Sequence, residues 1–445
     1  MKKSLAILLT FGLIATSLSG CGNGTNTNTG SKSASTAGSA AKTNSASKTS
    51  GSTTASSGNT DGEQVVLKVF DAHAYGLDEY AEMVKAFEES HPGVKIDVQH
   101  SSNDYKATLQ SRINSGDAPD VFDAQAGTDA KSYYDYAYDW TNDTEVTSKF
   151  RKEALALGTV DGKVMSLPWT YENMGLLYNV DVFEKAGIKT LPTTMDELEA
   201  VCEKLKAAGV TPIALAAKET WVLGQTATHF MMDKSLDAAG TVEAVESGKL
   251  KFADMPHWKN LFRFLDLAKK YGTEKPLEVD WETSENLLAN GKAGIIHMGD
   301  WCQSTLDSFN KDARIAFLPF PVGSGEKDAT LLSACNWTYI VNKDSKHLDL
   351  AKEYLEYILT SDKGQYWMCD GIGAVPGVKT DREIKGELAN DAAKYIAAGK
   401  TNGWIHTIAP ANYSDSVGPV LQSYMLGETT AEAATETIQE FWTAN

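Results

Sequence analysis

The sequence has few of the features that mark several large classes of protein. It holds five cysteines in 445 residues, which is too few for a disulfide scaffold. After residue 20, no apolar run approaches the roughly 18 residues that a membrane-spanning helix needs. Basic residues are scarce, with 41 Lys and Arg against 59 Asp and Glu, and the formal net charge is −18. Because nucleic-acid binding depends on clustered basic side chains, we expect no nucleic-acid partner.

Motifs of common catalytic and metal sites are absent as well. The sequence contains no GxxxxGK[ST] phosphate loop, no GxSxG turn, no CxxC pair and no HExxH helix. Acidic residues are so numerous that no pair can be assigned as a glycosidase dyad from sequence. We therefore expect no enzyme, no cofactor and no metal site. Cys302, Cys335 and Cys369 are compatible either with one disulfide or with buried thiols.

The N-terminus reads as a lipoprotein signal peptide over residues 1–20. Two lysines precede an apolar stretch, and the segment ends in Leu-Ser-Gly before Cys21. This ending resembles a bacterial lipobox, which implies that Cys21 is lipidated and becomes the first residue. An ordinary cleaved signal with an incidental cysteine is the alternative.

Residues 21–63 are expected to form the lipidated cysteine and a disordered tether. From Gly22 to Thr60 the chain contains only Gly, Asn, Thr, Ser, Ala and Lys, which cannot bury apolar surface. A flexible chain of that length has a root-mean-square reach of about 35 Å. The protein is thus expected on the extracellular face of a cell membrane, in a Gram-positive-type bacterium, with the lipid as its sole membrane contact.

The remaining sequence alternates strand and helix patterns, which predicts an α/β protein with a mostly parallel sheet. β-branched and alternating patterns predict strands, and apolar residues at helical spacing predict helices. In order, we expect a strand at 65–70, a helix around 80–87, a strand at 94–98, a helix at 105–115 and a strand at 120–122. Further on, Thr194 and Glu197 form a capping box before another helix, and a helix is expected from Leu348 to Ile358.

Five segments in order resemble the carbohydrate-binding family of extracellular solute-binding proteins of ABC importers. They are residues 84–96, 113–122, 161–169 with 175–179, 288–301, and 351–360 with 373–376. The resemblance implies a two-lobed periplasmic-binding-protein-like fold, with hinge strands and a ligand cleft between the lobes. The N-terminal lobe would comprise residues 64–170 and 336–384, and the C-terminal lobe residues 171–335 and 385–445.

The same resemblance implies a membrane-anchored, monomeric substrate-binding component of an ABC sugar importer. It would capture a carbohydrate, specifically an oligosaccharide, and deliver it to the permease subunits. Three alternatives share features of the sequence: a solute-binding sensor for a membrane receptor, a binding protein for a non-sugar solute, and an extracellular glycoside hydrolase. The hydrolase would need two carboxylates held across the cleft.

Candidate ligand-binding residues follow from the chemistry of sugars. Aromatic rings cover the C–H face of a pyranose, while carboxylates and amides hydrogen-bond to its hydroxyl groups. Positions that match the ligand-contacting loops of the family, or that follow predicted strands, are Trp169, Tyr171, Glu172, Trp221, Asp300, Trp301, Trp337, His73, Tyr75, Asp123, Gln125 and Tyr413. The patterns around Trp140, Trp258, Trp281 and Trp442 favour a structural role for those four rings.

Overall fold

The computed structural model of the protein describes residues 64–72, 77–101, 104–231 and 238–444. The signal peptide, Cys21 and the tether lie outside the described residues, as do His73 and Tyr75. Within the described ranges, no helix combines the length and apolar character that crossing a membrane requires.

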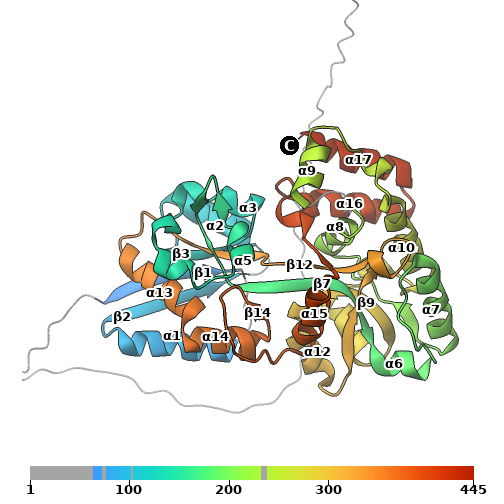
Figure 1. The fold of residues 1–445 in the computed structure, drawn as a ribbon, viewed down its shortest axis with the longest axis horizontal. Coiled ribbons are helices and arrows are strands. Elements are labelled where there is room, and N and C mark those ends of the chain that lie inside the picture. Colours follow the sequence, from blue (N-terminus) through green and yellow to red (C-terminus); the bar gives the residue numbers. More distant parts are fainter. Residues whose placement is uncertain (1–63, 73–76, 102–103, 232–237, 445) are drawn as a thin grey trace, which may run out of the picture. The chain divides into compact units, whose positions relative to one another are not determined.

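The first sheet has five strands in the order β2-β1-β3-β13-β6 (Figure 1). These strands are Val94–His100, Val65–Asp71, Val121–Gln125, Trp337–Val341 and Leu167–Pro168. β1 pairs in parallel with both β2 and β3, as the sequence predicted. The expectation of a mostly parallel sheet is otherwise wrong, because β13 runs antiparallel to β3 and β6, and the strands that pair with β7 all run antiparallel to it.

Helices cover both faces of the first sheet, and β1 therefore has buried residues on both of its sides. Leu67 and Val69 pack against α1 (Leu77–Ser90) and α13 (Leu348–Thr360). On the other face of the sheet, where Figure 1 shows α2 (Tyr105–Ser115), Phe70 packs with Phe122 of β3 and with that helix. The helix predicted at 105–115 is confirmed to the residue. Shorter helices follow, namely α3 (Thr128–Lys131), α4 (Thr144–Thr147), α5 (Lys152–Ala156) and α14 (Asp362–Tyr366).

The second sheet is built around the long strand β7 (Thr170–Asn179). Its main order is β11-β12-β7-β9-β8, with β10, β14 and β15 paired at its margins. The remaining strands are Phe320–Pro321 (β11), Ala329–Ala334 (β12), Ala293–Gly299 (β9), Thr211–Ile213 (β8), Ile315–Leu318 (β10), Val375–Pro376 (β14) and Thr401–Asn402 (β15). A separate hairpin joins β4 (Thr159–Val160) and β5 (Lys163–Val164).

A second core surrounds this sheet and is distinct from the cores of the first. Its helices are α6 (Val180–Lys185), α7 (Met195–Ala207), α8 (Thr220–Thr228), α9 (Ala238–Glu246), α10 (Trp258–Tyr271), α11 (Trp281–Ala289), α12 (Gln303–Asn310), α15 (Glu387–Ala397), α16 (Tyr413–Leu426) and α17 (Ala431–Ala444). The predicted capping box of α7 is present, since Thr194 accepts from the Glu197 amide and Glu197 accepts in return.

The chain passes between the two sheets three times. It leaves β6 for β7 at Trp169 and returns from β12 to β13 through Cys335 and Asn336. A third passage, residues 377–386, leads from Val378, which packs in a core of the first sheet, to α15 beside the second. The first two passages are short, so the residues on either side of each are held by both sheets.

The structure shows the state of four cysteines and confirms the structural role expected of three of four tryptophans. Cys202, Cys302, Cys335 and Cys369 are buried free thiols, so the disulfide alternative does not hold for the described residues. Trp140, Trp258 and Trp442 lie in the cores, as predicted. Trp281 does not: its side chain is 40% exposed, because it begins α11 at the protein surface.

Glu285 on α11 is a buried carboxyl group of this core, and its ionisation affects the stability of the protein. Its side chain is fully buried and neither carboxyl oxygen has a hydrogen-bond partner among the described residues. Burial, with a smaller contribution from the charge of Glu282, raises the pKa of Glu285 from 4.5 to about 9. The folded state therefore keeps this carboxyl neutral at pH 7, while the unfolded state ionises it.

We predict that Glu285→Gln stabilises the protein at neutral pH. Because the folded pKa is raised, stability is lost as the pH rises from about 4.5 to about 9. At pH 7 the loss amounts to about 3 kcal/mol, which the neutral amide avoids. Urea unfolding at pH 4 and pH 7 should show nearly equal stabilities at pH 4 and a clear gain at pH 7. Glu282→Gln, exposed on the same helix, is the control, and an equal gain there would contradict the prediction.

Candidate functional site

The carboxyl end of β3 brings Gln125 beside the start of β13. Gln125 and Trp337 are register partners across the two strands, and both side chains are half-buried. A groove of about 390 Å³ opens there, lined in part by Gln125, Trp337 and Tyr133. Asn412, which precedes α16, also lines it. The groove thus has walls from the first sheet and from the segment that leads into α16.

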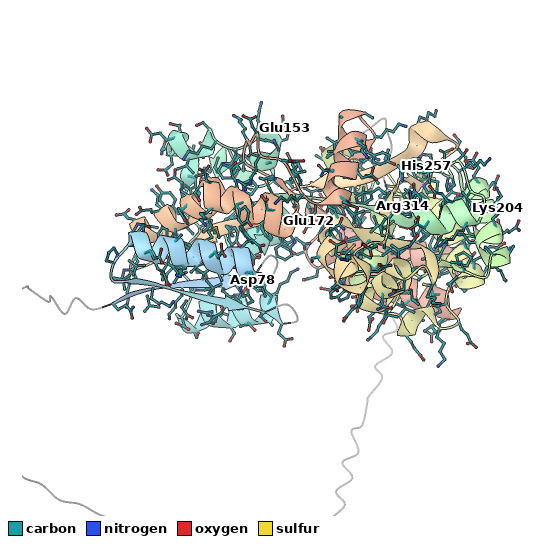
Figure 2. All side chains as sticks on the ribbon, turned by 90° about the horizontal axis from the view of Figure 1, so that it is seen from below. Asp78, Glu153, Glu172, Lys204, His257 and Arg314 are labelled. Atoms are coloured by element: carbon teal, nitrogen blue, oxygen red, sulfur yellow. The ribbon has the colours of Figure 1, made fainter. Side chains whose placement is uncertain are left out.

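Glu172 lies near the start of β7, next to the passage from β12 to β13 (Figure 2). Its Oε2 accepts a hydrogen bond of 2.8 Å from the Asn336 amide nitrogen. The Asn336 carbonyl in turn accepts from the Ala126 amide at 2.7 Å, just after β3. One passage residue therefore joins Glu172 of β7 to the end of β3.

Asp300 follows β9 and is held by β7. Its two carboxyl oxygens accept from the Asn173 backbone amide at 2.9 Å and from the Asn173 side-chain amide at 2.7 Å. Burial raises the pKa of Asp300 to about 7; the Asn173 hydrogen bonds oppose the rise, and the charge of Glu172 adds to it. The carboxyl group is thus committed to holding the turn that presents Trp301.

Three indole rings form a continuous group, here called the tryptophan row: Trp221, Trp301 and Trp404. The Trp301 ring stacks on Trp404 with centroids 5.9 Å apart and an interplanar angle of 19°. The centroids of Trp301 and Trp221 are 6.3 Å apart. Met174 and Leu332 of the second sheet pack in the same cluster. Trp221 and Trp301 are half-buried, so part of each residue's surface stays exposed.

Gly299 makes room for the Trp301 ring. A Cβ atom at Gly299 would lie 1.9 Å from Cζ3 of Trp301. The ring therefore lies directly over the backbone at the end of β9, and its orientation is set before any ligand arrives. Preorganised rings of this kind bind at a smaller entropic cost than mobile ones.

His406 connects the tryptophan row to the first sheet. Its ring lies 5.1 Å from that of Trp404, and its Nε2 is 2.7 Å from the Gln125 side-chain nitrogen. Burial, aided by the charge of Lys106, lowers the pKa of His406 to about 3, so the ring is neutral and its Nε2 accepts from the Gln125 amide. Nδ1 of His406 is buried without a partner among the described residues.

These contacts bring together six residues expected from the sequence: Gln125, Glu172, Trp221, Asp300, Trp301 and Trp337. Sequence reasoning missed Trp404 and His406, although both lie within ten residues of Tyr413, which it selected. The available signal was an aromatic and a polar ring two positions apart, directly after Gly403.

The structure places three other expected residues in packed interiors, so we correct their assignment. Trp169 is 2% exposed and stacks on Trp367 in the core of the first sheet. Tyr413 is 3% exposed and donates to the Gly224 carbonyl at 3.1 Å. Asp123 is fully buried and accepts from the Ala72 amide at 2.9 Å, which fixes the end of β1. Core packing and backbone capping occupy these side chains.

Tyr171 has an intermediate position on β7. It is half-buried, and burial raises the pKa of its hydroxyl group, with a smaller contribution from nearby Cys335. It pairs with Val375 of β14 rather than contacting the tryptophan row. Its expected role in ligand binding stays a prediction, as do those of His73 and Tyr75.

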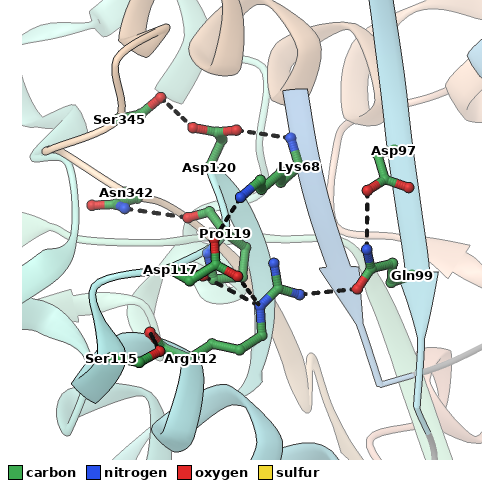
Figure 3. Close-up of polar contacts among 10 residues, drawn as sticks. All are labelled: Lys68, Asp97, Gln99, Arg112, Ser115, Asp117, Pro119, Asp120, Asn342 and Ser345. Carbon is green, nitrogen blue, oxygen red and sulfur yellow. Dashed lines mark hydrogen bonds and ion pairs between the residues drawn. The ribbon is translucent and has the colours of Figure 1, made fainter. Parts of the chain in front are cut away.

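A second hollow, of about 430 Å³, lies at the amino end of β3, and Figure 3 draws the polar contacts of residues beside it. Its polar groups bind one another: Asp120 accepts from the Lys68 amide at 2.7 Å, and the Lys68 ammonium group pairs with Asp117. Arg112 donates to Gln99 at 3.2 Å in the same network. Because these groups are already paired, the network fastens β1 to β3 and gives no reason to place a ligand there.

Comparisons with known proteins identify one family of similar proteins. Residues 73–365, more than half of the chain, match the family described as bacterial extracellular solute-binding protein. The multiple sugar-binding protein of Streptococcus mutans is 26% identical over 309 residues, covering 67% of this chain and 73% of that protein. The diacetylchitobiose binding protein DasA of Streptomyces coelicolor is 27% identical over 411 residues, covering 85% and 89%.

Solved structures show the same similarity at the level of the fold. The solute-binding protein RafE in complex with raffinose has a TM-score of 0.73 at 18% identity, covering 85% of this chain and 99% of that one. A chitin oligosaccharide binding protein has a TM-score of 0.71 at 21% identity, covering 85% and 98%.

Gly127 tests the contact between the end of β3 and the His406 segment. It has φ of +82°, and a Cβ atom there would lie 1.7 Å from the Thr407 carbonyl oxygen. We predict that Gly127→Ala costs at least twice as much stability as Gly116→Ala, where φ is +77° and the space is open. In the control variant Gly116→Ala, only the left-handed backbone conformation of the new residue is unfavourable, by about 1 kcal/mol.

Thermal unfolding measures the loss of stability in each variant. Small-angle scattering shows whether Gly127→Ala instead separates the end of β3 from the His406 segment. In that case Gly127→Ala should raise the radius of gyration while Gly116→Ala leaves it unchanged. Equal melting temperatures and equal radii for the two variants would show that the contact is absent in solution.

Proposed function

Because the chain belongs to the family of bacterial extracellular solute-binding proteins, which serve ABC importers, we propose that it captures an oligosaccharide and delivers it to a permease. The fold is the mixed α/β fold of periplasmic binding proteins, as the sequence predicted. Proteins of this family bind solutes and are not enzymes, so the glycoside hydrolase alternative is set aside.

The tryptophan row is the observation that carries the sugar assignment. Flat apolar rings suit the C–H faces of pyranoses, and each ring covers about one sugar unit. Two half-buried rings, Trp221 and Trp301, therefore suit a ligand of two or more units. Relatives named for multiple sugars, for diacetylchitobiose and for raffinose support the same ligand class.

Polar groups around the row suit the hydroxyl rim of such a ligand. The carboxylate of Glu172 and the amide of Gln125 can exchange hydrogen bonds with hydroxyl groups. Both already bond to neutral partners, Asn336 and His406, which keep them oriented. A sugar hydroxyl that replaces His406 as the partner of Gln125 would couple binding to movement of the His406 segment.

We extend the proposal to lobe movement and to the lobe boundaries 64–170 with 336–384, and 171–335 with 385–445. The three passages between the sheets support it, because rotation needs changes of conformation in those segments alone. Closure around the sugar would present one combined surface to the permease, and release would follow when the permease favours the open form.

The experiment that tests the sugar assignment compares two kinds of tryptophan. Trp301→Ala and Trp221→Ala should weaken binding of the sugar, first identified by thermal shift, by about 2–4 kcal/mol, roughly 30- to 1,000-fold. Trp442→Ala, whose ring is 1% exposed in the core, should lower the melting temperature and leave affinity nearly unchanged. Calorimetry measures all three, and Trp301→Ala binding within about threefold of wild type would refute the site.

Anchoring is proposed to depend on Cys21, which lies outside the described residues. The lipobox resemblance supports it, and a solved structure of the same fold is described as a probable secreted solute-binding lipoprotein. Cys21→Ala should release the protein into the medium or leave it unprocessed, with sugar binding unchanged. Ser45→Ala in the tether is the control. Membrane fractionation decides: a processed Cys21→Ala protein that still sediments with membranes would disprove the anchor.

A further inference from the structure

Trp281 stands apart from the other nine tryptophans of the chain. Six of these are buried and three are half-buried, whereas the Trp281 side chain is 40% exposed. A single exposed apolar residue is ordinary on a protein surface. Its position relative to the candidate site gives it significance.

Trp281 lies on the same edge of the second sheet as the tryptophan row. β8 and β9 run parallel, so their carboxyl ends share one edge. Trp301 follows β9 there, and Trp221 follows β8 by way of the segment that contains Lys218. The Lys218 amide donates to the Val279 carbonyl at 3.1 Å, which fastens the start of α11 to this edge.

The first turn of α11 is capped and tied to the segment that contains Lys218. The Asp280 carboxylate accepts from the Thr283 amide at 2.9 Å and pairs with the Lys218 ammonium group at 3.1 Å. Lys218 is only three residues from Trp221, so one ion pair links the two ring-bearing segments. The capped turn fixes the backbone that carries the ring, so less backbone freedom is lost when a ligand stacks on it.

We propose that Trp281 is an outer stacking platform for a sugar unit beyond those that contact Trp221 and Trp301. The proposal rests on the proposed sugar-binding function and deepens it, because it assigns a ligand of at least three units. Its ring offers the flat apolar face that a pyranose requires. Its open position suits the end of a chain that projects from the site, where a shorter sugar would not reach.

The test uses ligands of increasing length. Disaccharide, trisaccharide and tetrasaccharide members of one series, chosen by thermal shift from sucrose–raffinose–stachyose, malto- and chito-oligosaccharides, are titrated by calorimetry. Trp281→Ala should weaken the longest member about 5- to 30-fold and leave the shortest within about twofold. Trp281→Phe should restore most of the loss. Leu426→Ala, 60% exposed at the end of α16, is the control and should change nothing.

The outcomes separate this inference from the proposed function. If wild type binds no sugar of any series, both fail. If Trp301→Ala weakens every sugar while Trp281→Ala weakens none, only the outer platform is overturned. Equal weakening of all lengths by Trp281→Ala also overturns it, because that pattern assigns Trp281 to the shape of the inner site.

Discussion

Asp300 accepts hydrogen bonds from both the backbone and the side-chain nitrogen of Asn173, and this pair joins the end of β9 to β7. Burying a carboxyl group is costly, and two hydrogen bonds offset part of that cost. The pair fixes the turn at residues 300–302, and with it the Trp301 ring that lies against Gly299. Because β7 also carries Glu172, the same pairing sets the polar and the apolar sides of the site relative to each other.

The site is thereby assembled from segments far apart in the chain. Trp221, Trp301 and Trp404 come from three different connections of the second sheet, while Gln125 and Trp337 come from the first. Each sheet has its own core, and two of the three passages between them have only one or two residues. Such an arrangement would keep the proposed ligand-contacting groups rigid within each sheet and adjustable between sheets, as the proposed lobe movement requires.

Local pattern predicted the elements well and for clear physical reasons. The helix at 105–115, the strands around 65–70, 94–98 and 120–122, and the α7 capping box all follow from periodicity or from a short-range hydrogen bond. These signals need no knowledge of distant residues. The same reasoning could not detect the antiparallel pairing of β13 with β3, because a register is set by partners more than 200 residues apart.

For the site, residue patterns alone predicted the family, the α/β class and the loops that meet at the strand ends. They could not determine whether a given ring faces ligand or core. Trp169 and Trp301 both follow strands in similar surroundings, yet one stacks on Trp367 in the core and the other remains half open. The fold shows which rings are buried, because burial depends on which distant segments pack beside a ring. The same cause explains why Trp404 and His406 were missed and why Trp281 lies at the surface.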